Sequence, residues 1–261
     1  MEPQKSWIDR RLAPLGRAVL NVFYPRVCRV CDTCLPESSS DSPYGEWLCQ
    51  KCEGQLLPLE KPYCQRCGEP YAGATDRDFV CENCGDLELV FDFAVAGYLA
   101  EGPLRELVHG FKYGKDEGLR ACLGALLEKA LADERLAGED LTQWGLIPVP
   151  LHHARERERE FNQAEELCHV LSQRTAIPTW NALKRIRSTG QQASLTRKQR
   201  LDNLRGAFAL RRGFGKDRLA GRRVLLVDDV LTTGSTTDAC ARVLKRQAGV
   251  EKVVVITVAR S

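Results

Sequence analysis

The residues best suited to chemistry lie in the stretch VLLVDDVLTTGST, residues 224–236. An apolar run ends at two adjacent carboxylates, Asp228 and Asp229, and a hydroxyl-rich loop around one glycine follows. Carboxylates suit the vicinal hydroxyls of a sugar. A glycine lets backbone N–H groups approach an anion, and the N-terminus of a following helix favours a phosphate. The stretch therefore predicts a site for a sugar phosphate, with the loop LTTGST suited to the phosphate.

Other motifs of similar appearance differ from this stretch. A P-loop needs Gly-x-x-x-x-Gly-Lys and a dinucleotide fingerprint needs Gly-x-Gly-x-x-Gly, and neither run occurs here. A receiver domain can also end a strand in paired aspartates, but it would lack the Thr-Thr-Gly-Ser-Thr loop. An ordinary strand–turn–helix would leave two carboxylates at a buried edge without a partner, which is costly.

The elements that must position this loop alternate between strands and helices. Strands are predicted at Val90–Leu99, Gly145–Pro150, Arg222–Asp229 and Val250–Ala259, and helices at Gly102–Tyr113, Gly118–Leu136, 161–175 and Ser235–Gln247. Strands separated by helices indicate an α/β fold, with a parallel sheet covered by helices on both faces. Ligands bind outside the carboxyl ends of such strands, which is where Asp228 and Asp229 fall.

Cysteines mark a second region with chemistry of its own. Nine of the 12 cysteines precede residue 85, and eight of them form four Cys-x-x-Cys pairs. These pairs are Cys28/Cys31, Cys49/Cys52, Cys64/Cys67 and Cys81/Cys84. A reducing cytosol disfavours disulfides, whereas two such pairs complete a tetrahedral zinc shell. The sequence therefore predicts two structural Zn²⁺ ions.

The pairing of these cysteines follows from their spacing only in part. The gaps of 17 residues after Cys31 and 13 residues after Cys67 suit two zinc ribbons in succession, and interleaved pairing stays open. A thioredoxin-like redox pair usually needs one Cys-x-x-Cys beside a βαβ unit rather than four. Shells made only of thiolates are closed, structural sites. The three later cysteines, Cys122, Cys168 and Cys240, lie in apolar helical patterns and are predicted to be core residues.

Charge and hydropathy bear on location and partners. No apolar run approaches the roughly 20 residues of a membrane span, and the N-terminus lacks the pattern of a signal peptide, so a cytoplasmic protein is expected. The net charge is +3, but residues 184–223 hold 13 Lys or Arg and two acids. This basic block favours a polyanion, either nucleic acid or a ligand with several phosphates, and a solvated surface is the simpler alternative.

The chain as a whole resembles the ComF family, the competence-protein-F or GntX-like proteins of bacteria. The resemblance rests on the double zinc ribbon, on LVHGFKYG with Lys112, on IPVPLHHARERERE followed by FNQ, and on VLLVDDVLTTGST. It also rests on STGQQASLTRKQRLDNLRGAF, where the matching positions are Thr189, Gln192, Leu195, Arg200, Asn203 and Phe208. VLLVDDVLTTGST alone is similar to the phosphoribosyl pyrophosphate (PRPP) motif of type I phosphoribosyltransferases.

The resemblance implies roles for individual residues. Asp228 and Asp229 would hold the ribose hydroxyls and act in catalysis, and residues 232–236 would cradle the 5′-phosphate. Lys112, Arg155, Arg159, Gln192 and Arg200 would complete the PRPP site. Arg155 and Arg159 belong to the region that meets pyrophosphate, and 184–205 looks like a hood over the substrate. This chain departs from the family at Glu160, where a glycine usually precedes Phe-Asn-Gln, and that change could weaken pyrophosphate binding.

Three segments and two functions follow. We expect an N-terminal helical segment (1–25), a double zinc ribbon (26–88) and a type I phosphoribosyltransferase-like domain (89–261). By resemblance, the chain would bind PRPP with Mg²⁺ and act in DNA uptake or the use of external DNA, with uptake-machinery proteins as partners. No segment identifies an acceptor, so phosphoribosyl transfer stays open. The alternative is a non-catalytic module that binds single-stranded DNA, with PRPP as a regulatory ligand and stacking by ribbon aromatics such as Tyr44, Trp47, Tyr63 or Tyr71.

Overall fold

A computed structural model describes most of the chain after residue 24. The described residues are 25–36, 42–71, 73, 77–85, 88–113, 116–151, 160–187, 199 and 203–261. They form two compact units, Met1–Gln55 and Leu56–Ser261. The boundary falls between the second and third Cys-x-x-Cys pairs, so each unit contains two pairs.

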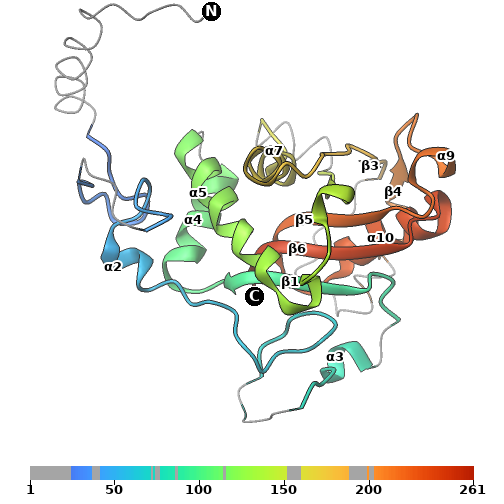
Figure 1. Ribbon diagram of the computed structural model, residues 1–261, viewed down its shortest axis with the longest axis horizontal. Coiled ribbons are helices and arrows are strands. Elements are labelled where there is room, and N and C mark those ends of the chain that lie inside the picture. The colour runs from blue at the N-terminus through green and yellow to red at the C-terminus, as the bar shows by residue number, and fades with distance from the viewer. Residues whose placement is uncertain are drawn as a thin grey trace, which may run out of the picture. The chain divides into compact units, whose positions relative to one another are not determined.

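The larger unit is built on a four-stranded parallel sheet with the strand order β1-β6-β5-β2. Figure 1 shows β1, β6 and β5 side by side. The strands are β1 (Phe93–Leu99), β2 (Gly145–Pro148), β5 (Arg223–Leu231) and β6 (Lys252–Arg260). The apolar runs of β5 and β6 are almost continuous, which is typical of parallel strands buried on both faces. The predicted strands are confirmed, and β5 runs two residues beyond Asp229.

Helices cover both faces of this sheet, as the α/β pattern predicts. The helices are α4 (Gly102–Tyr113), α5 (Glu117–Glu128), α7 (Gln163–Thr175) and α10 (Ser235–Ala248). Helices α5 and α7 pack against each other and against the sheet, and α10 packs against β5 and β6. The face beneath α10 carries Val224, Leu226, Val253 and Val255, which are all fully buried.

The long predicted helix 118–136 is wrong in its second half. Helix α5 ends at Glu128, and two short 3₁₀ turns follow, η1 (Lys129–Ala132) and η2 (Glu134–Leu136). Asp133 between these turns is extended, and its carboxylate accepts a hydrogen bond from the backbone N–H of Arg135. Aspartate competes in this way with helical hydrogen bonding, so the chain restarts a turn instead of continuing the helix.

Short elements complete the described part of the chain. Strands β3 (Leu183–Arg185) and β4 (Phe208–Leu210) form an antiparallel pair at the base of the predicted hood. Three-residue strands are too short for an alternating pattern, and the sequence did not predict them. The other short elements are α2 (Gln50–Glu53), α3 (Glu82–Gly85), η3 (Leu141–Gln143) and α9 (Lys216–Leu219).

Residues 57–59 cover the edge of the sheet at β1. The Leu59 N–H donates to Gly97 O, and the Leu99 N–H donates to Leu57 O.

Among the described residues, no helix is long and apolar enough to cross a membrane. The predicted N-terminal helical segment (1–25) lies almost entirely outside the described residues.

Candidate functional site

The two acidic residues lie in the last third of β5, toward the carboxyl edge of the sheet. Asp228 pairs with Thr257 of β6 and is partly buried, and Asp229 is 8% exposed. Each carboxylate accepts the backbone N–H of the following residue, at 2.9 Å for Asp228 and 2.7 Å for Asp229. These bonds fix the direction of both side chains.

Lys112 meets this pair from a distant part of the chain. It lies in the last turn of α4, and its Nζ is 3.0 Å from Oδ2 of Asp229. The two side chains are 27% and 11% exposed, so the pair is only partly open to solvent. The structure thus brings together a cation that was expected only by resemblance and a carboxylate that the motif predicted.

The loop after β5 leads directly into α10. Gly234 has φ of +75°, a left-handed conformation that disfavours any side chain, and a Cβ there would lie 3.5 Å from the Phe91 ring. The Thr233 and Ser235 hydroxyls are hydrogen-bonded to each other at 3.0 Å, and Thr237 donates to Gly234 O. The N-cap residue of α10 is Gly234, which has no side chain to bond the first N–H groups of the helix. The N–H groups of a helix start suit an anion.

Four of the predicted PRPP ligands lie outside the described residues. They are Arg155, Arg159, Gln192 and Arg200. The first two follow β2, whose last residue Pro148 pairs with Val227 of β5. The other two lie between β3 and β4 in the sequence. Their roles stay predictions.

Glu160 has an unfavourable backbone conformation. Its φ is +65°, in the left-handed region where glycine is favoured, and the residue is exposed. This conformation destabilises the folded state by roughly 1–2 kcal/mol for a residue with a side chain. For glycine, the loss of backbone entropy on folding costs about 0.5–1 kcal/mol. The family's usual glycine fits this conformation, and the glutamate of this chain occupies it under strain.

Replacing Glu160 with glycine is therefore expected to raise the free energy of unfolding by about 0.5–1 kcal/mol. Ala176→Gly should behave in the same way, because Ala176 ends α7 with φ of +61°. Ala137→Gly is the control, since Ala137 has φ of −61° and should lose about as much as the others gain. Urea unfolding measures all three, and a Glu160→Gly variant that is destabilised like Ala137→Gly would contradict the strain argument.

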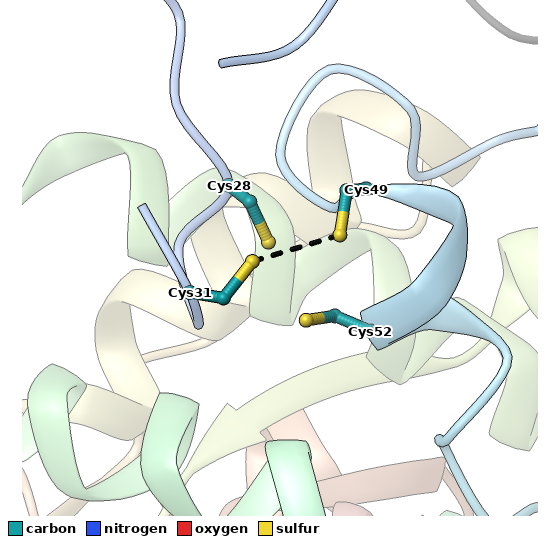
Figure 2. A group of neighbouring side chains, drawn as sticks. All are labelled: Cys28, Cys31, Cys49 and Cys52. Atoms are coloured by element: carbon teal, nitrogen blue, oxygen red, sulfur yellow. Dashed lines mark hydrogen bonds between the residues drawn. The ribbon is translucent and has the colours of Figure 1, made fainter. Parts of the chain in front are cut away.

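Each compact unit contains one cluster of four cysteines. Cys28, Cys31, Cys49 and Cys52 form the first cluster, and Cys64, Cys67, Cys81 and Cys84 form the second. Figure 2 shows the four sulfur atoms of the first cluster pointing toward one another, with Cys49 and Cys52 at helix α2. The pairing is sequential, which settles the alternative that the spacing left open.

The geometry of both clusters fits tetrahedral zinc. The ligand atoms of each cluster lie within 4.8 Å of one another, and the Cys31–Cys49 and Cys67–Cys81 sulfur pairs are both 3.7 Å apart. Zinc–sulfur bonds of about 2.3 Å in a tetrahedron place neighbouring sulfurs about 3.8 Å apart. A hydrogen bond with Thr33 lowers the pKa of Cys31 to about 6, while burial raises the pKa of Cys81 to about 11.

The two clusters repeat one local design. In the first pair of each, the residue after the second cysteine is left-handed, with φ of 56° at Asp32 and 67° at Gly68. The N–H of that residue donates to the first cysteine's carbonyl in both cases. The second pair of each cluster lies at a short helix, α2 or α3. The cysteine turns are thus an internal repeat, and all eight predicted metal-ligand cysteines take part.

The remaining cysteines do not join a cluster in the described part of the chain. Cys122, Cys168 and Cys240 are fully buried, which confirms them as core residues. Burial raises the pKa of Cys168 and Cys240, so both are held as neutral thiols.

Comparison with known proteins matches two parts of the chain to known domain families. The double zinc ribbon domain family matches residues 19–86, and the phosphoribosyl transferase domain family matches residues 164–261. Competence protein F of Haemophilus influenzae is 36% identical over 216 residues, which cover 82% of this chain and 90% of that protein. The chain belongs to the ComF family.

Other relatives extend the match. DNA utilization protein YhgH of Escherichia coli K12 is 32% identical, over 77% of this ComF-family chain and 86% of the relative. Competence protein ComFC of Bacillus subtilis is 24% identical, over 90% of this chain and 95% of that protein. The relatives therefore share the ribbon and the sheet domain together.

Two buried charged residues of this ComF chain were missed by the sequence analysis. Asp238, in the first turn of α10, is fully buried and accepts hydrogen bonds from Val90 N–H (2.5 Å) and Arg242 Nε (2.8 Å). Arg260, at the end of β6, is 3% exposed. An apolar run that ends at a charged residue was the available signal for Arg260, as it was for the acidic pair Asp228 and Asp229.

Proposed function

We propose that this chain binds PRPP together with Mg²⁺ at the carboxyl edge of the sheet. The observation that supports this most directly is that one strand–loop–helix segment carries both groups that suit a ribose and groups that suit a phosphate. Asp228 and Asp229 supply carboxylates for the ribose hydroxyls, and the start of α10 supplies N–H groups for the 5′-phosphate. Thr232, Thr233, Gly234, Ser235 and Thr236 are the proposed phosphate ligands.

The remaining ligands are proposed from the family resemblance and from charge. Lys112, whose Nζ lies beside Asp229, would meet an anionic oxygen of the ligand. Arg155 and Arg159 would bind pyrophosphate, and Gln192 and Arg200 would contact the ligand from the hood. Mg²⁺, a hard cation that bridges phosphate oxygens, would offset the negative charge of PRPP when bound.

The same residues suit transfer of the phosphoribosyl group. Departure of pyrophosphate builds positive charge on the sugar ring, and the carboxylates of Asp228 and Asp229 would stabilise that charge. A closed hood would exclude water and so limit simple hydrolysis. The names of the relatives, with competence and DNA utilization, support a role in DNA uptake or the use of external DNA. The two thiolate clusters suit a reducing, cytoplasmic location.

The proposal is tested by equilibrium titration of the zinc-loaded chain with PRPP and Mg²⁺. We expect saturable binding of PRPP, weaker binding of ribose 5-phosphate and of pyrophosphate alone, and loss of PRPP affinity without Mg²⁺. Equal affinity for all three compounds would contradict a site that joins ribose and two phosphate positions. A screen of bases, amines and DNA for pyrophosphate release from PRPP then tests transfer.

Single-stranded DNA binding is the second candidate function, and one observation favours it. Tyr71, in the second ribbon, is 50% exposed and its ring lies 5.1 Å from that of Phe79, which forms a small aromatic surface. Tyr63, by contrast, is buried and donates to Asp133 at 3.1 Å, so it serves packing. Base stacking on an exposed tyrosine is worth about 1–3 kcal/mol.

If single-stranded DNA binds here, its affinity should fall about 100-fold between 50 and 200 mM salt, as expected for roughly five phosphate contacts. Tyr71→Ala should weaken binding about 10-fold. Tyr113→Ala is the matched control, because Tyr113 is 65% exposed but lies outside the ribbon. Fluorescence anisotropy with a labelled oligonucleotide measures both effects, and an affinity that ignores salt would remove this candidate.

A further inference from the structure

Arg260 connects the second cysteine cluster to the end of β5. Its Nε donates to the carbonyl oxygen of Cys67 at 3.0 Å, and its Nη1 donates to the carbonyl oxygen of Leu231 at 2.9 Å. Its Nη2 lies 3.9 Å from the Cys67 sulfur and pairs with the carboxylate of Glu69. One buried side chain thus contacts a metal ligand and the residue that immediately precedes the Thr232–Thr236 loop.

The chemistry of arginine suits this connection. A guanidinium is planar and rigid, so two carbonyls bound by it are held at a fixed separation. Zn²⁺ with four thiolates has a net charge of about −2, and a buried cation beside one thiolate offsets that charge. Arg260 is only 2% exposed in its side chain, so its charge needs partners, which are the Cys67 sulfur, Glu69 and the Ser261 oxygen that Nη1 also bonds.

We propose that Arg260 is a positioning residue that couples metal binding at the second cluster to the conformation of the Thr232–Thr236 loop. Metal at Cys64, Cys67, Cys81 and Cys84 fixes the Cys67 turn, the guanidinium transmits that position to Leu231, and the loop begins at the next residue. The consequence for ligand affinity rests on the proposed PRPP function. The coupling of metal and loop does not.

A second arginine provides a matched control. Arg135 also donates to the Cys64–Cys67 turn, with Nη1 at 2.7 Å from Gln65 O, and it also bonds β1 at Ala94 O. It pairs with Asp133, and its side chain is 15% exposed. The described contacts of Arg135 do not include Leu231 or any residue of the loop. Replacing either arginine therefore loosens the same turn, but only one replacement releases the loop.

The test compares Arg260→Met, Arg260→Lys and Arg135→Met in the zinc-loaded chain. Three quantities are measured: zinc release to a chromogenic chelator, amide hydrogen exchange at residues 231–237, and Mg²⁺-PRPP affinity. For Arg260→Met we expect zinc affinity at the second cluster to fall about 10–100-fold. Amide exchange in the loop should rise about 10-fold. The rise is not larger because the Ser261 N–H also bonds Leu231 O, at 3.0 Å, and still holds that residue. Arg135→Met should leave loop exchange within about twofold of the wild type.

Arg260→Lys keeps the charge but cannot hold both carbonyls at once. In this variant the rate of zinc release should stay within about threefold of the wild type, while amide exchange in the loop still rises. If Arg260→Met does not fold, Arg260→Lys alone tests the coupling. The proposal is overturned if loop exchange in both Arg260 variants equals that of Arg135→Met. If the wild type binds no PRPP, the proposed function fails, while zinc release and exchange still judge the coupling.

Discussion

Replacing both Asp228 and Asp229 with asparagine is expected to weaken Mg²⁺-PRPP binding by about 100-fold or more. A hydrogen bond to a charged group contributes about 1.5–3 kcal/mol, and the double substitution removes the charge from both proposed acceptors of the ribose hydroxyls. Asparagine also places an NH₂ where one carboxylate oxygen lies, so a donor would face a hydroxyl or a cation. Isothermal titration calorimetry at matched Mg²⁺ concentration measures the loss.

The substitution of Asp229 also removes its ion pair with Lys112. Lys112 lies 3.0 Å from Oδ2 of Asp229, and neither side chain is more than 27% exposed. Asp229→Asn removes the carboxylate beside Lys112, and removing a negative group from the site favours a free anion such as pyrophosphate there. The double variant should therefore retain affinity for inorganic pyrophosphate while it loses affinity for PRPP. This contrast separates loss of ribose recognition from general damage to the site.

The matched control is Asp217→Asn with Glu251→Gln, which removes two carboxylates from exposed positions. This control should bind PRPP like the wild type, because surface charges are screened at physiological salt. Equal affinity of the wild type and of the Asp228→Asn/Asp229→Asn variant would remove the acidic pair from the ligand site, and with it the assignment of ribose binding to β5.

The second large effect concerns stability, and it differs between the two cysteine clusters. Cys81→Ser with Cys84→Ser is expected to lower the free energy of unfolding of the Leu56–Ser261 unit by about 3–5 kcal/mol. Cys64, Cys67 and Cys84 belong to the same buried cluster as Leu89, Phe91 and residues of α10. Loss of metal there leaves buried thiols without their ion inside the core that supports β5.

Cys28→Ser with Cys31→Ser is the comparison, because the first cluster lies in the other compact unit, Met1–Gln55. This variant should lose one Zn²⁺ and leave the midpoint of the Leu56–Ser261 transition unchanged. Trp144 and Trp180 lie in that unit, so fluorescence in a Trp7→Phe/Trp47→Phe background follows its unfolding. Equal destabilisation by both double substitutions would contradict the idea that the second cluster alone supports the sheet domain.

Local patterns predicted much of this molecule. The apolar runs of β5 and β6, the helices α4, α7 and α10, and the two sets of cysteine turns each depend on neighbours along the chain, and the structure agrees with them. The failure at Asp133 is also local in origin, since one side-chain hydrogen bond to Arg135 N–H decided between helix and turn. Strands β3 and β4 were missed because three residues carry too little periodicity.

What the sequence by itself determined is the inventory: an acidic pair before a hydroxyl-rich loop, eight cysteines in four turns, and alternating strands and helices. Only the tertiary structure decided that the cysteine pairs join in sequence, that the second cluster packs into the core of the sheet domain, and that Lys112 reaches Asp229. The link from Cys67 through Arg260 to Leu231 joins residues that are far apart along the chain. Contacts of this kind depend on how packed elements meet in space, and local periodicity and spacing do not encode that arrangement.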